Sequence, residues 1–169
     1  MATREDWTRA ALGALADGGV SAVAVDRLTK VVGATRGSFY WHFKDRDELV
    51  AAALALWERE YTTDLIPLAE AVPDPRERLR VLFERVYEPR AEPIEIALAK
   101  AADDPLVAPV FARVGEARMA LLRSIFLELG LSPEEAEART WLAWAFYVGH
   151  HQAPGRPERL DRIVALLGS

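Results

Sequence analysis

Apolar residues along the chain recur three and four positions apart, the spacing of one face of an α-helix, and no stretch shows the alternation of a β-strand. The first stripe of this kind consists of Trp7, Ala11 and Leu15. Thr3 begins a capping-box pattern before the stripe, and Gly18 follows it. The pattern therefore predicts a first helix between Thr3 and Gly18, in a chain that is all-α.

Residues 25–44 predict two short helices joined by a tight corner. Apolar side chains at helical spacing mark the first helix, and Gly33 interrupts them. Thr35 is a favourable N-cap for the second helix. Phe39 and Phe43 are four residues apart, so they share one face of that helix. The expected structure is a helix-turn-helix whose two phenylalanines face the interior.

The face opposite these phenylalanines carries glycine, serine and aromatic residues, whereas a solvated helix usually carries glutamate, lysine and glutamine. Residues 21–44 also hold four basic side chains against one acidic side chain, in a chain whose net charge is −5. An aromatic and positively charged second helix is typical of a helix-turn-helix that binds DNA.

Residues 24–50, AVDRLTKVVGATRGSFYWHFKDRDELV, resemble the DNA-binding segment of the TetR family of bacterial transcriptional regulators. The similarity is strong over about residues 3–60, and beyond them it is one of length and helix order. This segment differs from the family at Ala24, where the family often has Ser or Thr to cap the first motif helix. The residues that match the family are Leu28, Gly33, the FYWHF run at 39–43, Lys44 and the pair Glu48-Leu49.

The outward face and the resemblance together predict a set of DNA-contacting residues. We expect hydroxyl and basic side chains to bind phosphates or base edges, Gly37 to allow close approach to the backbone, and Trp41 to stack on a sugar or a thymine methyl. Arg4, on the first helix, is either a phosphate contact or an ordinary solvated arginine. The full set is Arg4, Arg27, Thr35, Arg36, Gly37, Ser38, Tyr40, Trp41, His42 and Lys44.

Capping signals predict further helices over the rest of the chain. Asp45, with Glu48 three residues later, begins a long helix, and Pro67 places its end near residues 64–66. The later helices are expected to start at Asp74-Pro75, near Ile94, at Asp104-Pro105, at Ser132-Pro133 and near Pro157.

The resemblance implies two domains. Residues 1–48 would form a three-helix DNA-binding domain, and residues 49–169 a helical regulatory and dimerisation domain in which residues 49–64 are the connecting helix. In the family the last two helices pair with those of a second copy in a four-helix bundle. Residues 133–149 and 157–167 are therefore expected to form a homodimer interface.

Aromatic side chains in the second domain are either ordinary core or the walls of a ligand cavity, and the cavity is implied by the resemblance. The candidates are Trp57, Tyr61, Phe83, Tyr87, Phe111, Met119, Trp144 and Tyr147. The function expected from the resemblance is that of a repressor that binds a palindromic operator as a homodimer. A small apolar effector, of unknown identity, would release it from the DNA.

Composition narrows the classes of protein that fit. At 169 residues and 51% hydrophobic, the chain can bury the core of one or two small domains. It has no cysteine, which excludes disulfides and thiolate metal sites. No apolar run is as long as a membrane span and the N-terminus has no signal-peptide hydrophobic region, so we expect a cytoplasmic protein. The first 50 residues carry seven basic and seven acidic side chains, so the net acidity lies elsewhere and leaves room for a positive patch.

Other chemistry has weaker support. The adjacent pair His150-His151 does not share a helix face, which favours histidines at a helix end over a metal pair, so no metal or other cofactor is expected. Asp103-Asp104 is interpreted as a helix break and cap, and no catalytic triad, phosphate loop or HExxH pattern is present. Two alternatives remain: a helical enzyme or cofactor-binding protein with a fused motif, and an adaptor that contacts protein and shows no salt-dependent affinity for duplex DNA.

Overall fold

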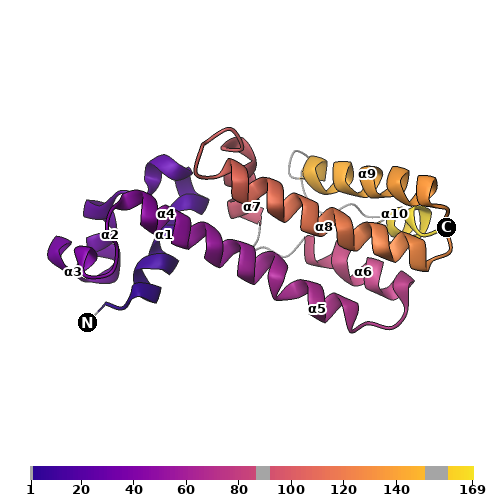
Figure 1. Cartoon of the computed structure of the whole chain (residues 1–169), viewed down its shortest axis with the longest axis horizontal. Coiled ribbons are helices and arrows are strands. Elements are labelled where there is room, and N and C mark those ends of the chain that lie inside the picture. Colours follow the sequence, from indigo (N-terminus) through magenta and orange to yellow (C-terminus); the bar gives the residue numbers. More distant parts are fainter. Residues whose placement is uncertain (1, 87–91, 151–159) are drawn as a thin grey trace. The chain divides into compact units, whose positions relative to one another are not determined.

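The computed structural model describes residues 2–86, 92–150 and 160–169, and these residues form helices and no strand (Figure 1). The all-α prediction is confirmed. Contacts divide the chain into two compact units. Unit 1 contains residues 1–61 and 93–113, and unit 2 contains residues 62–92 and 114–169. The functional division at residue 48 is a different partition of the chain and stays a prediction.

Unit 1 begins with the predicted helix-turn-helix and its supporting helices. Its elements are α1 (Arg4–Gly18), a 3₁₀ segment η1 (Val20–Ala22), α2 (Val25–Val32), α3 (Arg36–Tyr40), α4 (Arg46–Glu58), most of a π-helical segment η2 (Arg59–Thr63), α7 (Glu92–Lys100) and the first turns of α8 (Ala108–Glu128). Helix α1 packs along α4, and α2 contacts both α1 and α3.

Local capping explains where the N-terminal helices start and stop. Thr3 accepts a hydrogen bond from the backbone of Asp6, and the Asp6 carboxylate accepts one in return, as the capping-box pattern predicts. Ala24 provides no side-chain cap for α2. Gly33 ends α2 at φ 64°, a left-handed conformation that glycine adopts at little cost. The Thr35 hydroxyl then accepts a hydrogen bond from the Ser38 backbone N–H at 3.2 Å and starts α3.

Two predicted boundaries were wrong. The helix that starts at Asp45 ends at Glu58 rather than near residues 64–66, and the chain continues through η2 into a separate helix, α5 (Leu65–Glu70). Pro67 lies in the first turn of α5, where a backbone N–H has no helical acceptor. The helix expected to start at Asp104-Pro105 starts four residues later, at Ala108, whose N–H bonds to the backbone oxygen of Asp104 at 2.8 Å. The Asp104 side chain accepts the N–H of Leu106 in the turn before it.

Unit 2 is built from α5, α6 (Pro75–Val86), the rest of α8, α9 (Pro133–His150) and α10 (Leu160–Leu167). The capping box at Ser132 is present. The Ser132 hydroxyl accepts the backbone N–H of Glu135, and the Glu135 carboxylate accepts the backbone N–H of Ser132. The core draws on all five helices, with Phe83, Ile125 and Phe126 among its buried residues. The predicted start of the last helix near Pro157 lies outside the described residues. No described helix combines the length and the apolar character needed to cross a bilayer.

Candidate nucleic-acid interface

The inner face of α3 is fixed by aromatic packing. Phe39 and Phe43 are both buried, and their rings are stacked with centroids 5.7 Å apart. Trp7 of α1 meets Phe39 edge-on at 5.5 Å, so the first helix supports the helix predicted to bind DNA. Edge-to-face and offset aromatic contacts stabilise a core beyond the area they bury. The predicted inward direction of the two phenylalanines is confirmed.

The outer surface at α3 exposes large aromatic side chains. Trp41 is 83% exposed, although it lies only two residues from the buried Phe39. Tyr40 is also exposed, while one edge of its ring rests on Phe39 at 5.1 Å. Gly37 has open space around it, since a Cβ there would meet only the Thr35 hydroxyl at 3.7 Å. A surface that is flat at Gly37 and aromatic beside it is suited to contact with another molecule.

Charged side chains surround this aromatic surface. Arg27 and Lys30 are exposed on α2, and Lys44 is exposed just after α3. Arg36, at the first position of α3, reaches back to Asp26 of α2, with Nη1 and Oδ1 3.5 Å apart. Asp26 is the acidic residue that the sequence count found among the basic side chains of residues 21–44. The structure brings it to Arg36, which is exposed at the start of α3.

Two predicted contacts are engaged within the protein. Arg4 donates to the backbone oxygen of His42 and, at 2.9 Å, to the carboxylate of Glu48. Its guanidinium also lies 4.1 Å from the centre of the Phe43 ring, where a cation–π attraction adds to the ion pair. The His42 Nε2 lies 3.0 Å from the backbone oxygen of Ala2. Both residues therefore attach the N-terminal segment to the turn that follows α3.

Glu48 joins these groups electrostatically. Its carboxylate accepts hydrogen bonds from the backbone N–H of Lys44 at 2.8 Å and from Arg4. These two bonds lower the pKa of Glu48 below its ordinary value, and the bond from Lys44 has the larger effect. The second half of the predicted capping box is thereby altered, because Glu48 receives the N–H of Lys44 and not that of Asp45.

Helical spacing predicts that Ser38 faces outward, opposite Phe39 and Phe43, but its hydroxyl is not on the open surface. Its Oγ is buried and has no hydrogen-bond partner among the described residues. Helix α3 is only five residues long, and Trp41, His42 and Phe43 follow it in a turn.

Sequence reasoning missed residues that act through tertiary contacts. Arg46 donates to the backbone oxygens of Val23, at 2.8 Å, and Val20, and so holds η1 against the start of α4. In the sequence, Asp26 is recognisable only as a charge and Glu48 only as a cap. The one signal in the sequence was that Asp26 is an acid among basic residues.

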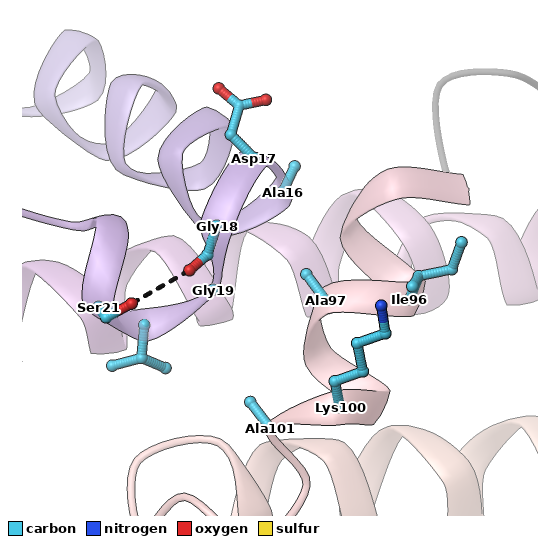
Figure 2. Close-up of a pocket in the computed structure, with 10 residues that line it drawn as sticks. Ala16, Asp17, Gly18, Gly19, Ser21, Ile96, Ala97, Lys100 and Ala101 are labelled. Carbon is cyan, nitrogen blue, oxygen red and sulfur yellow. Dashed lines mark hydrogen bonds between the residues drawn. The ribbon is translucent and has the colours of Figure 1, made fainter.

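A separate groove of about 360 Å³ lies within unit 1, between the end of α1 and α7 (Figure 2). Small residues form much of it, with Asp17 on one side and Lys100 on the other. Ser21 donates to the backbone oxygen of Gly18 at its edge. None of the aromatic residues proposed for a ligand cavity lines this groove.

The predicted ligand-cavity residues are divided between the units. Trp57, Tyr61 and Phe111 belong to unit 1, where the buried Trp57 donates to Glu95 and stacks on Phe111. In unit 2 Phe83 packs on Phe146, Trp144 stacks on Tyr147 at 5.3 Å, and Met119 is half-buried. Tyr87 and His151, and the side chain of His150, lie outside the described residues. No cluster of three metal-ligating side chains occurs in the described part of the chain.

The family model of bacterial regulatory proteins of the tetR family matches residues 8–53, a segment with most of α1, all of α2 and α3, and the first half of α4. The fold of the whole described chain agrees with solved structures of such regulators. A transcriptional regulator from Rhodococcus sp. Rha1 superposes with a TM-score of 0.80 and 21% identity, over 98% of this chain and 94% of that one. Residues 8–53 are thus similar to the DNA-binding segment of the TetR family, and the described chain shares the fold of such regulators. Members of this family are DNA-binding transcriptional regulators and not enzymes.

Individual proteins are similar to this chain either in sequence over its N-terminal part or in fold. AcrR of Shigella flexneri is 38% identical over 56 residues, which are 33% of this chain and 25% of that protein. SrpR of Pseudomonas putida is 35% identical over 65 residues, which are 38% of this chain and 30% of that protein. The matched part of the chain thus spans less than a third of these relatives. The multidrug binding protein EbrR, solved with imidazole, shares the fold at 22% identity and a TM-score of 0.70, over 97% of this chain and 92% of that one.

Proposed function

We propose that the chain is a TetR-family repressor that binds a palindromic operator as a homodimer and is released by a small apolar effector. The observation that carries the proposal is the contrast between the two sides of the segment that contains α3. Phe39 and Phe43 are buried, while Tyr40 and Trp41 are exposed beside Arg36. Exposed aromatic rings bring little to the stability of this unit, so their presence is explained by contact with a ligand. Basic side chains around them indicate that the ligand is the DNA backbone and its groove.

Double substitution of Arg36→Ala and Tyr40→Ala tests this assignment. We expect operator binding to be lost while the protein stays folded and dimeric, because both side chains are exposed and neither fills the core. Arg76→Ala with Leu68→Ala is a matched control that removes an exposed arginine and an exposed apolar side chain from unit 2. Unchanged operator affinity in the Arg36 and Tyr40 variant would show that α3 does not bind DNA.

The proposed dimer interface is an exposed stripe on α9. Trp141, Leu142 and Val148 are exposed large apolar side chains of this helix, and the smaller Ala138 and Ala145 extend the same stripe at helical spacing. Leu166 on α10 is exposed as well, and the Arg139 side chain donates to the backbone oxygens of residues 166 and 167. A second copy of the chain is the occupant we propose, because a two-fold interface uses the same patch on both subunits.

Such a dimer would place two α3 helices in successive major grooves, about 34–36 Å apart. A larger or smaller separation would not match the DNA, which gives an effector a way to act. An effector releases the protein only if it binds the mismatched arrangement more tightly than the matched one. The larger the difference between the effector's affinities for the two arrangements, the more the effector should lower the affinity of the protein for its operator.

Aromatic and polar groups in unit 2 support the effector part of the proposal. Arg118 donates to the Tyr147 hydroxyl at 2.6 Å and to the Thr62 hydroxyl at 2.9 Å, and Trp144 stacks on Tyr147. Apolar walls with a few fixed polar groups are the usual lining of small-molecule sites. EbrR, which has the same fold, is a multidrug binding protein solved with proflavin. Isothermal titration of this chain with planar aromatic compounds, with and without operator, tests whether such ligands displace the DNA.

A further inference from the structure

The ion pair between Asp26 and Arg36 joins the two helices of the motif on its exposed side. Asp26 is in the first turn of α2, and Arg36 is the first residue of α3. Their Oδ1 and Nη1 atoms are 3.5 Å apart, and both side chains are largely exposed. An acid at this place weakens the attraction of the motif for phosphates, so its presence has to be explained by something other than general affinity for DNA.

Arginine can serve two acceptors at once. Its planar guanidinium carries five N–H donors, and an acid beside Nη1 leaves Nε and Nη2 available to other acceptors. Two such donors match the O6 and N7 acceptors of guanine in the major groove. A phosphate gains less from an arginine that is already paired, because its contact depends on net positive charge more than on the geometry of a base edge.

We propose that Asp26 is a positioning residue that raises the sequence specificity of Arg36. By pairing with Arg36, it lowers the arginine's affinity for the phosphates of any duplex and aims its free edge at a base. The inference rests on the proposed function, since it assumes that α3 enters the major groove. It goes further by naming the residue that separates specific from nonspecific binding.

Asp26→Asn tests the proposal, because it removes the charge and keeps the size of the side chain. Binding is measured over a range of salt concentrations to two duplexes, one with the consensus selected by the unaltered protein and one with a scrambled sequence. We expect tighter binding to the scrambled duplex and a salt dependence that is steeper by about one phosphate contact per protomer. The ratio of the two affinities should fall about tenfold.

Asp17→Asn is the matched control for the change of net charge. Asp17 is exposed at the far end of α1, about 15 Å along the helix from Trp7, which supports α3. We expect this variant to keep the affinity ratio of the unaltered protein. Thermal unfolding of both variants monitors the fold, since Asp26 also lies near the N-terminus of α2, where an acid is favourable.

The decisive measurement places Asp26→Asn in an Arg36→Ala background. If Asp26 acts by positioning Arg36, its substitution then leaves the salt dependence and the affinity ratio of that background unchanged. An equal shift in both backgrounds would overturn the inference, because Asp26 would then only repel phosphates. An unchanged affinity ratio in Asp26→Asn alone would overturn it too. If the unaltered protein shows no salt-dependent binding to either duplex, the proposed function falls together with the inference.

Discussion

The guanidinium of Arg4 binds the carboxylate of Glu48 at 2.9 Å, although 44 positions of sequence separate them. The same carboxylate accepts the backbone N–H of Lys44, directly after the segment that carries the exposed aromatic rings. Through this one acid the start of α1 and the start of α4 hold the turn that follows α3. The position of the turn beside the proposed DNA-binding surface therefore depends on this contact.

Glu48→Gln should make the protein less stable at pH 7 and its stability less dependent on acid. The pKa of Glu48 is lowered in the folded state by the Lys44 N–H and by Arg4. A lowered pKa gives a contribution to stability that is full above about pH 5 and is lost as the pH falls through the folded-state value. Urea unfolding at pH 7 and at pH 4 measures both effects. Glu70→Gln, at an exposed site on α5, is the control and should change neither; equal behaviour of the two variants would contradict the role given to Glu48.

Phe39→Ala and Tyr40→Ala should have opposite profiles, although the residues are neighbours. Phe39 is fully buried against Trp7 and Phe43, so its truncation should cost about 3–5 kcal/mol of unfolding free energy. Tyr40 is exposed, and its truncation should cost far less stability while weakening operator binding. Denaturant titration with a parallel binding assay separates the two. A similar loss of stability in both variants would mean that Tyr40 belongs to the core.

Gly33→Ala and Gly37→Ala should shift stability in opposite directions. Gly33 has φ 64°, where a Cβ is strained even though open space surrounds it, so alanine should cost about 1 kcal/mol. Gly37 lies inside α3 with room for a methyl group, so alanine should stabilise the fold by about 0.5–1 kcal/mol. The Gly37 methyl should nevertheless weaken operator binding, because it stands on the proposed contact surface. Stronger binding by Gly37→Ala would contradict the close approach proposed there.

If the chain forms the proposed dimer, Leu142→Glu should convert it into a folded monomer. Leu142 and Leu68 are both 62% exposed, but Leu142 belongs to the proposed interface on α9 and Leu68 lies on α5. A glutamate at Leu142 would leave a charge buried at a two-fold interface, next to its own copy. Sedimentation velocity should show a monomer for Leu142→Glu and a dimer for Leu68→Glu. The reverse result would move the interface to the face that carries α5.

Local signals let the sequence predict most helix starts. Thr3, Thr35 and Ser132 act through residues three positions away, and Gly33 acts through its own backbone, so each can be recognised without tertiary information. Pro67 was a weaker guide. A proline forbids the interior of a helix but is compatible with the first turn of a new one, which is where it lies.

The location of the candidate site was predictable from the sequence, but the hydrogen-bond partners of its side chains were not. The aromatic run at residues 39–43 marks the segment, and the buried Phe39 follows from its spacing. The environments of Arg4 and His42 do not, because their partners Glu48 and Ala2 are about 40 positions away in sequence. Whether an arginine faces solvent or a distant carboxylate is decided by the packing of α1 on α4, and the spacing of charges in the sequence does not contain that information.

Selection from a random duplex pool at low salt, followed by sequencing of the retained DNA, tests the central claim most directly. The account predicts a palindromic consensus whose half-sites lie about one helical turn apart, since two α3 helices of a dimer would enter successive major grooves. The retained binding should weaken steeply as salt is raised. A pool that stays random at low salt would contradict the account, because the exposed surface around Arg36 and Trp41 would then not be reading DNA.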